Sequence, residues 1–108
     1  LMKFSNGDKS FVRDVLTTFL KDAPDAINNL EKFLSEGNSL EAANILHRFK
    51  PNLETLGLQN LRNDAIFLEN ELKDTSSTDP ETLMRMCKPF MDRLMQALSS
   101  LRRSLKEL

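Results

Sequence analysis

The sequence contains one histidine, His47, and a lysine three residues after it, Lys50. An imidazole ring is partly neutral near pH 7, and a neutral imidazole is a nucleophile. An ammonium group one helical turn away can place positive charge against the oxygens of a transferred phosphoryl group. Together the two residue types fit phosphoryl transfer, provided that a helix holds both of them on an accessible face.

The apolar residues on either side of His47 recur at the spacing of an amphipathic helix. At about 100° per residue they form a single stripe, made by Ala42, Leu46, Phe49, Leu53 and Leu56. His47 projects roughly 140° from the middle of this stripe, and its neighbours one and two turns away are small, polar or charged. We therefore expect an exposed imidazole that a partner can reach.

Composition bounds the classes of protein to which the chain can belong. It has 108 residues, 15 basic and 16 acidic side chains and a net charge of −1, which gives no indication of nucleic-acid binding. No apolar run approaches the ~18 residues of a membrane-spanning helix, and the N-terminus lacks the basic-then-apolar layout of a signal peptide. These features predict a single soluble domain.

The cysteine and glycine content excludes several kinds of site. Cys87 is the only cysteine, so an internal disulfide and a zinc site built on paired cysteines are both impossible, which fits a reducing compartment. The three glycines form no phosphate-binding cluster. We expect no metal site, no bound cofactor and no ATP site in this chain.

Helical periodicity extends over most of the sequence, and no segment alternates as a strand does. Pro24 disfavours helical geometry in the residue before it, so a first helix should end near residue 22. Gly37 and Gly57 should end later helices in the left-handed conformation. The predicted elements are an N-terminal helix at about 9–22 and bundle helices at about 23–36, 39–57, 58–73 and 79–106.

Short connections between helices favour antiparallel neighbours. The predicted fold class is therefore all-α, an up-and-down antiparallel four-helix bundle with an additional short N-terminal helix. We expect one domain over residues 1–108.

His47, Lys50 and Gly57 reproduce a pattern of histidine, lysine three residues later and glycine ten residues later. With this pattern the chain resembles the histidine phosphotransfer (HPt) domains of bacterial-type phosphorelays. The segment 7–11, Gly-Asp-Lys-Ser-Phe, is similar to the start of the family's first helix, and 19–24 is similar to its first helix junction. The resemblance covers most of the chain and implies five helices, four of which form the bundle.

The resemblance implies a phosphorelay intermediate in two-component signal transduction rather than an enzyme. His47 would accept a phosphoryl group from a receiver-domain aspartate and pass it to another receiver, with Lys50 as electrostatic support. The catalytic acids and Mg²⁺ would belong to the partner receiver domain. The implied partners are response-regulator receiver domains and a sensor histidine kinase, with no nucleic acid and no direct membrane contact.

The same resemblance leaves the setting of the domain open. We expect a cytoplasmic monomer, either free-standing or forming the cytoplasmic C-terminal module of a membrane-bound hybrid sensor kinase.

Partner docking is expected on the helix face around His47, at Ala43, Asn44, Arg48, Pro51, Glu54 and Gly57. The family commonly has glycine directly after the motif lysine, where this chain has Pro51. Proline has no N–H to donate to the carbonyl of His47, so we expect a local bend that alters docking. Gly57 is interpreted as a helix terminator, a docking feature or both.

Two other functions fit parts of the sequence. The first is a helical module that docks receiver domains without carrying phosphate, and Pro51 is the residue that favours it. The second is the dimerisation domain of a histidine kinase, because 47–51 distantly resembles its His-Glu-x-x-x-Pro box. Arg48 replaces the acidic residue of that box and the proline comes one position early, so the second alternative is the weaker one.

Overall fold

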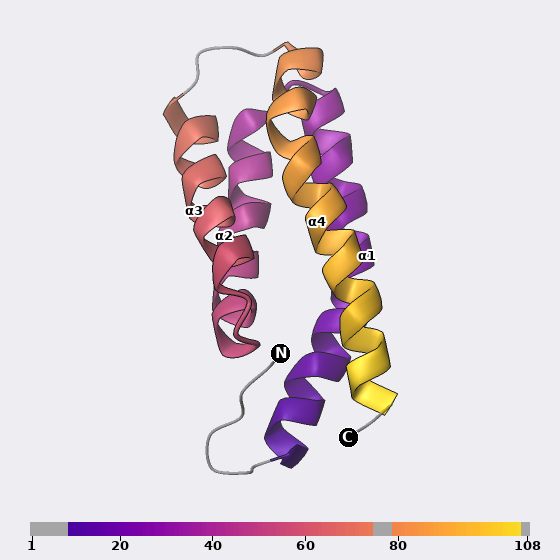
Figure 1. Ribbon diagram of the computed structural model, residues 1–108. Helices are drawn as coiled ribbons and strands as arrows, with labels where there is room; N and C mark the ends of the chain where they lie inside the picture. Colours follow the sequence, from indigo (N-terminus) through magenta and orange to yellow (C-terminus); the bar gives the residue numbers. More distant parts are fainter. Residues whose placement is uncertain (1–8, 75–78, 107–108) are drawn as a thin grey trace.

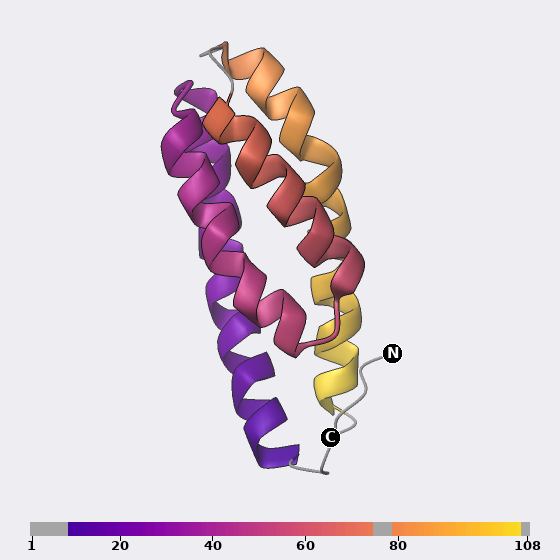
Figure 2. The ribbon, with the colours of Figure 1, turned by 90° about the vertical axis from the view of Figure 1, so that its left-hand side faces the viewer.

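The computed structural model describes residues 9–74 and 79–106, which form four helices in an up-and-down antiparallel bundle (Figure 1). The helices are α1 (Lys9–Ser35), α2 (Ser39–Thr55), α3 (Gln59–Asp74) and α4 (Pro80–Lys106). The first and last helices, α1 and α4, are the longest, and both extend past the turn that joins α2 to α3 (Figures 1 and 2). The predicted all-α four-helix bundle is confirmed.

The predicted separate N-terminal helix is wrong. α1 continues through Pro24 without interruption, so the segments expected at 9–22 and 23–36 are one helix. A proline inside a helix removes one hydrogen bond, but here the buried positions keep helical spacing on both sides of it, at Leu16, Phe19, Ala23, Ile27, Leu30 and Leu34. Packing of this continuous stripe outweighs the local preference of the residue before proline. Gly7 and Asp8, on which part of the resemblance rests, lie outside the described residues.

The other helix boundaries lie within two residues of the predicted ones. The side chain of Asn38 accepts a hydrogen bond from the backbone N–H of Glu41 at 3.2 Å, which satisfies a free donor in the first turn of α2. Gly37, at φ 73°, follows α1 in the left-handed conformation that glycine adopts easily. Pro51 and Pro89 both lie inside continuous helices.

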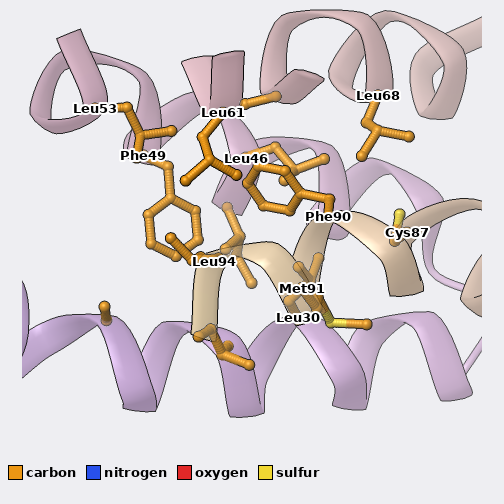
Figure 3. Close-up of a cluster of buried hydrophobic side chains, with 14 of the residues drawn as sticks. Leu30, Leu46, Phe49, Leu53, Leu61, Leu68, Cys87, Phe90, Met91 and Leu94 are labelled. Carbon is orange, nitrogen blue, oxygen red and sulfur yellow. The ribbon is translucent and has the colours of Figure 1, made fainter. Parts of the chain in front are cut away.

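The core runs along the axis of the bundle and is built from one apolar stripe of each helix (Figure 3). Phe49 of α2 belongs to this core, with its ring centroid 6.1 Å from that of Phe19 and 6.4 Å from that of Phe90, both in edge-to-face geometry. Such contacts join α1, α2 and α4. With Phe49 facing inward, the opposite face of α2 is turned toward solvent.

No helix in the described part of the chain is both long and apolar enough to cross a membrane.

Candidate functional site

His47 lies near the middle of α2 on the face opposite the core, and 63% of its side chain is exposed. This confirms the exposed imidazole predicted from the helical spacing. The helix that carries His47 has a defined start and end, because Asn38 caps its N-terminus and Gly57 follows its C-terminus. The ring is therefore presented from a rigid element rather than from a loop.

The turn after α2 determines which residue of α3 faces His47. Gly57 has φ 76°, the N–H of Leu58 donates to the carbonyl of Leu53 at 2.8 Å, and the N–H of Gly57 donates to that of Glu54 at 3.1 Å. These two bonds are the Schellman ending of a helix. The chain then reverses, and because the rise per residue is the same in both helices, the middle of α3 lies level with His47. The residue of α3 whose side chain contacts the ring is Glu69.

Glu69 is the acceptor for three side chains around the ring. Its Oε2 atom lies 3.0 Å from Nδ1 of His47 and 2.8 Å from Nζ of Lys73, and its Oε1 atom lies 2.8 Å from Nζ of Lys50. Only 5% of the Glu69 side chain is exposed, whereas its partners all reach solvent. The carboxylate thus lies beneath the imidazole and holds it to α3.

These contacts keep Glu69 ionised. Burial on its own raises the pKa of the carboxyl group, but hydrogen bonds from Lys50, Lys73 and His47, together with the charge of Lys50, outweigh burial and lower the pKa from 4.5 to about 2. An ionised carboxylate only accepts hydrogen bonds, so Nδ1 of His47 must be the donor. In the neutral ring the lone pair is then on Nε2, the outer nitrogen, which is the nucleophilic atom.

Lys50 lies beside His47 as predicted, and its ammonium group contacts the carboxylate of Glu69. Its side chain is 26% exposed and projects from the flank of α2 that faces α3. Lys50 and His47 share the carboxylate of Glu69, so the positive charge of Lys50 lies close to the imidazole. The expected role of Lys50, electrostatic support of a phosphoryl group, remains a prediction.

The residues expected to dock a partner do not all reach the surface. The prediction that Ala43 docks a partner is wrong, because this residue is fully buried, with 0% of its surface exposed. It lies two turns before Lys50 on the same flank of α2, and the Lys50–Glu69 contact shows that α3 covers this flank. Asn44 and Arg48 are exposed.

The remaining predicted docking residues lie toward the C-terminal end of α2. Pro51 and Glu54 are exposed and line a hollow between α2 and α3 that Lys50 also lines. Glu54 pairs with Arg62 of α3 across this hollow at 2.7 Å. Gly57 is exposed and ends α2, so its predicted role as a terminator is confirmed, and its role in docking remains a prediction.

Sequence reasoning missed Glu69 and Lys73, although a signal for both was present. Glu69 falls between Ala65 and Leu72 at spacings of four and three residues, so it interrupts the apolar stripe of α3. A carboxylate at a core-facing position needs partners, and Lys73 follows it at the i+4 spacing of a helical ion pair.

The remaining candidate groups lie outside this site. Cys87 is buried, and burial raises the pKa of its thiol to about 11, so it is a poor nucleophile. Within residues 9–74 and 79–106, no three side chains of histidine, cysteine, aspartate or glutamate are grouped closely enough to hold a metal ion.

Comparison with protein families gives one finding. The family model of the Hpt domain matches residues 14–105, which include most of α1, all of α2 and α3, nearly all of α4 and the whole of the site. No curated protein and no solved structure matches the chain significantly.

Proposed function

Because the chain belongs to the Hpt domain family, we propose that His47 is the residue on which it carries a phosphoryl group. Hpt domains are phosphoryl carriers of two-component phosphorelays rather than kinases, and they interact with receiver domains. His47 is the only histidine in the sequence. The observation that carries the proposal is the exposed imidazole of His47, whose Nδ1 nitrogen is held by the buried carboxylate of Glu69 so that Nε2 is the nitrogen left for the phosphoryl group.

The proposed transfer step uses this geometry directly. The lone pair on Nε2 attacks the phosphorus of an aspartyl phosphate on a receiver domain, the P–O bond breaks, and the receiver regains its aspartate carboxylate. The ring becomes an N-phosphoryl imidazolium that still has its proton on Nδ1. Glu69 accepts a hydrogen bond from that proton, so its negative charge stabilises the cationic ring while the phosphoryl group is carried.

Donation to a second receiver is the reverse of acceptance. An aspartate carboxylate attacks the phosphorus, the N–P bond breaks, and the neutral imidazole is restored with its proton on Nδ1. The protein needs to supply orientation and charge for this chemistry. Lys50 contributes positive charge beside the ring, and the receiver contributes Mg²⁺.

We place receiver docking on the exposed face of α2 around His47, at Asn44, Arg48, Pro51, Glu54 and Gly57. Phosphoryl transfer requires the reacting atoms to come within about 3–3.5 Å of each other, so the receiver must cover this face. The expected setting is cytoplasmic, either as a free-standing monomer or as a module of a hybrid sensor kinase.

The test is transfer of label from phosphorylated receiver domains to the purified chain, without ATP and without a kinase. A panel of receivers is incubated with the wild type and with His47→Gln, and folding of both proteins is checked by circular dichroism. The expected result is acid-labile, base-stable label on the wild type and none on the variant. Lack of label on a folded wild type that still binds a receiver would instead establish a docking module that carries no phosphate.

A further inference from the structure

We propose that Lys73 of α3 is the ammonium group that moves onto the phosphoryl group of His47, while Lys50 stays on Glu69. This inference rests on the proposed phosphorylation of His47. It assigns different roles to the two lysines that hold Glu69: Lys73 is a direct ligand of the phosphoryl oxygens, and Lys50 is a positioning residue for the carboxylate.

The hydrogen bonds of Glu69 decide which lysine can leave. Oε2 accepts from two groups, His47 Nδ1 at 3.0 Å and Lys73 Nζ at 2.8 Å. Oε1 accepts from Lys50 Nζ, at 2.8 Å. If Lys73 leaves, each carboxylate oxygen still has one of these donors. If Lys50 leaves, this contact to Oε1 is lost in a side chain that is only 5% exposed, which is costly for a charged group.

Side-chain exposure also favours Lys73 as the lysine that leaves Glu69. The side chain of Lys73 is 49% exposed, against 26% for Lys50, so Lys73 can reorganise with less change in packing. Lys73 also shares the Oε2 atom with the ring, so its ammonium group lies within two hydrogen-bond lengths of Nδ1. Changes in side-chain torsions alone can turn a lysine from one acceptor to a neighbouring one.

The charges of the two states supply the driving force. In the resting site one carboxylate holds two ammonium groups, which leaves an excess of positive charge beside the neutral ring. A phosphoryl group brings about −1.5 to −2 charge and three strong acceptor oxygens. After transfer, Lys73 can pair with this new charge while Glu69 keeps both Lys50 and the protonated ring. Every charged group in the cluster then retains a partner.

The test uses phosphoramidate, a small phosphoryl donor that needs no protein partner. Its P–N bond breaks, ammonia leaves and the phosphoryl group is transferred to the ring. Wild type, Lys73→Met and Lys50→Met are phosphorylated, with Lys88→Met as a matched control because Lys88 is a lysine of α4 outside the cluster. The pH titration of the phosphoryl group is then followed by ³¹P NMR.

We expect Lys73→Met to raise the pKa of the phosphoryl group by roughly half a unit, because a cation at contact distance favours its dianionic form. Lys73→Arg should restore the wild-type titration. Lys50→Met should shift the titration less, but it should lower the free energy of unfolding more, since it removes the contact of Lys50 with Oε1. Lys88→Met should change neither quantity.

A second measurement observes the ammonium groups themselves. In ¹H–¹⁵N spectra of the lysine side chains, phosphorylation should move the Lys73 signal and leave that of Lys50 close to its original position. A larger response of Lys50, or a Lys73→Met titration equal to that of wild type, would overturn the inference.

The two proposals fail separately. Phosphorylation by phosphoramidate together with no transfer from any receiver would remove the relay function and still leave the lysine assignment testable on the phosphorylated chain. Transfer from receivers with an unchanged Lys73→Met titration would remove the lysine assignment alone. A chain whose His47 accepts phosphate from neither source would overturn both.

Discussion

The pair α2–α3 and the long helix α4 are both amphipathic, but they place their charges differently. In α2–α3, Glu69 is buried and its partners His47 and Lys50 come from the other helix. In α4, the ion pairs Arg85–Glu81 and Lys88–Asp92 lie within one helix, and all four side chains are exposed.

This difference separates a site from a solubilising surface. Exposed pairs at i,i+4 spacing contribute about 0.3–0.5 kcal/mol each, and their main effect is to keep a helix face polar. A buried carboxylate loses its hydration and depends on its partners, so its geometry is specified by the fold. The buried charged cluster of α2–α3 is therefore the site proposed for phosphoryl transfer, while the exposed pairs Arg85–Glu81 and Lys88–Asp92 of α4 are surface charges.

The largest effect should come from the apolar core that both regions share. Phe90 is 1% exposed and packs edge-to-face on Phe49 (Figure 3). Phe90→Ala should lower the free energy of unfolding by about 3–5 kcal/mol, because it removes a buried ring and leaves a cavity. Denaturant unfolding measures this loss. Met95→Ala, at an exposed position of the same helix, is the control and should stay within about 0.5 kcal/mol of wild type.

Glu69→Gln should have the next largest effect and should depend on pH. The pKa of Glu69 is about 2 in the folded chain against an ordinary 4.5, so its ionised form stabilises the fold above pH 4.5, and this contribution is lost as the pH falls toward 2. The shift corresponds to about 3 kcal/mol at neutral pH. Unfolding curves of wild type and variant should therefore differ most at pH 7.

Unfolding measurements at low pH test the cause of the stability difference between wild type and Glu69→Gln. Near pH 2 the carboxyl group of Glu69 is about half protonated in the folded chain and almost fully protonated in the unfolded chain, so the stability gap between wild type and Glu69→Gln should shrink strongly. A gap of constant size from pH 7 to pH 2 would show that the amide destabilises the fold through its shape, and that the ionised cluster contributes little.

Most of the architecture follows from the sequence because it depends on repeated, local signals. The stripe of α2 identified the exposed side of His47, and glycines ended α1 and α2 at the expected places. The break at Pro24 was predicted from a local preference, which the long apolar stripe of α1 overrides. Local rules fail here because burial of this stripe depends on packing against α2 and α4.

The site was only half predictable for a related reason. His47 and Lys50 lie on one helix, so their spacing in the sequence places them together. Glu69 and Lys73 join them only after the chain reverses at Gly57, and the partner of a residue across two helices depends on how those helices pack. The prediction for Ala43 failed because polar residues share its flank of α2 in the sequence, whereas α3 covers Ala43 in the folded chain.

A smaller effect is expected where the α2–α3 pair reverses direction. A Cβ atom built at Gly57 meets nothing within 4 Å, yet φ is +76°. Gly57→Ala should therefore cost about 1–2 kcal/mol through backbone strain alone, and Gly57→Asn should cost less because asparagine tolerates this conformation. If the receiver transfer rate of folded Gly57→Ala equals that of wild type, Gly57 acts as a terminator only; a slower transfer would add a docking role.

The smallest effect is expected at Glu81, the carboxylate of α4 that offers the matched comparison with Glu69. Its Oε1 atom lies 3.1 Å from Arg85, but 81% of its side chain is exposed, so water replaces the arginine at little cost. Glu81→Gln should change the free energy of unfolding by no more than about 0.5 kcal/mol and should leave phosphoryl acceptance by His47 unchanged. A loss as large as that of Glu69→Gln would mean that burial does not distinguish the two carboxylates, and that the charged cluster of α2–α3 is no more specialised than the surface of α4.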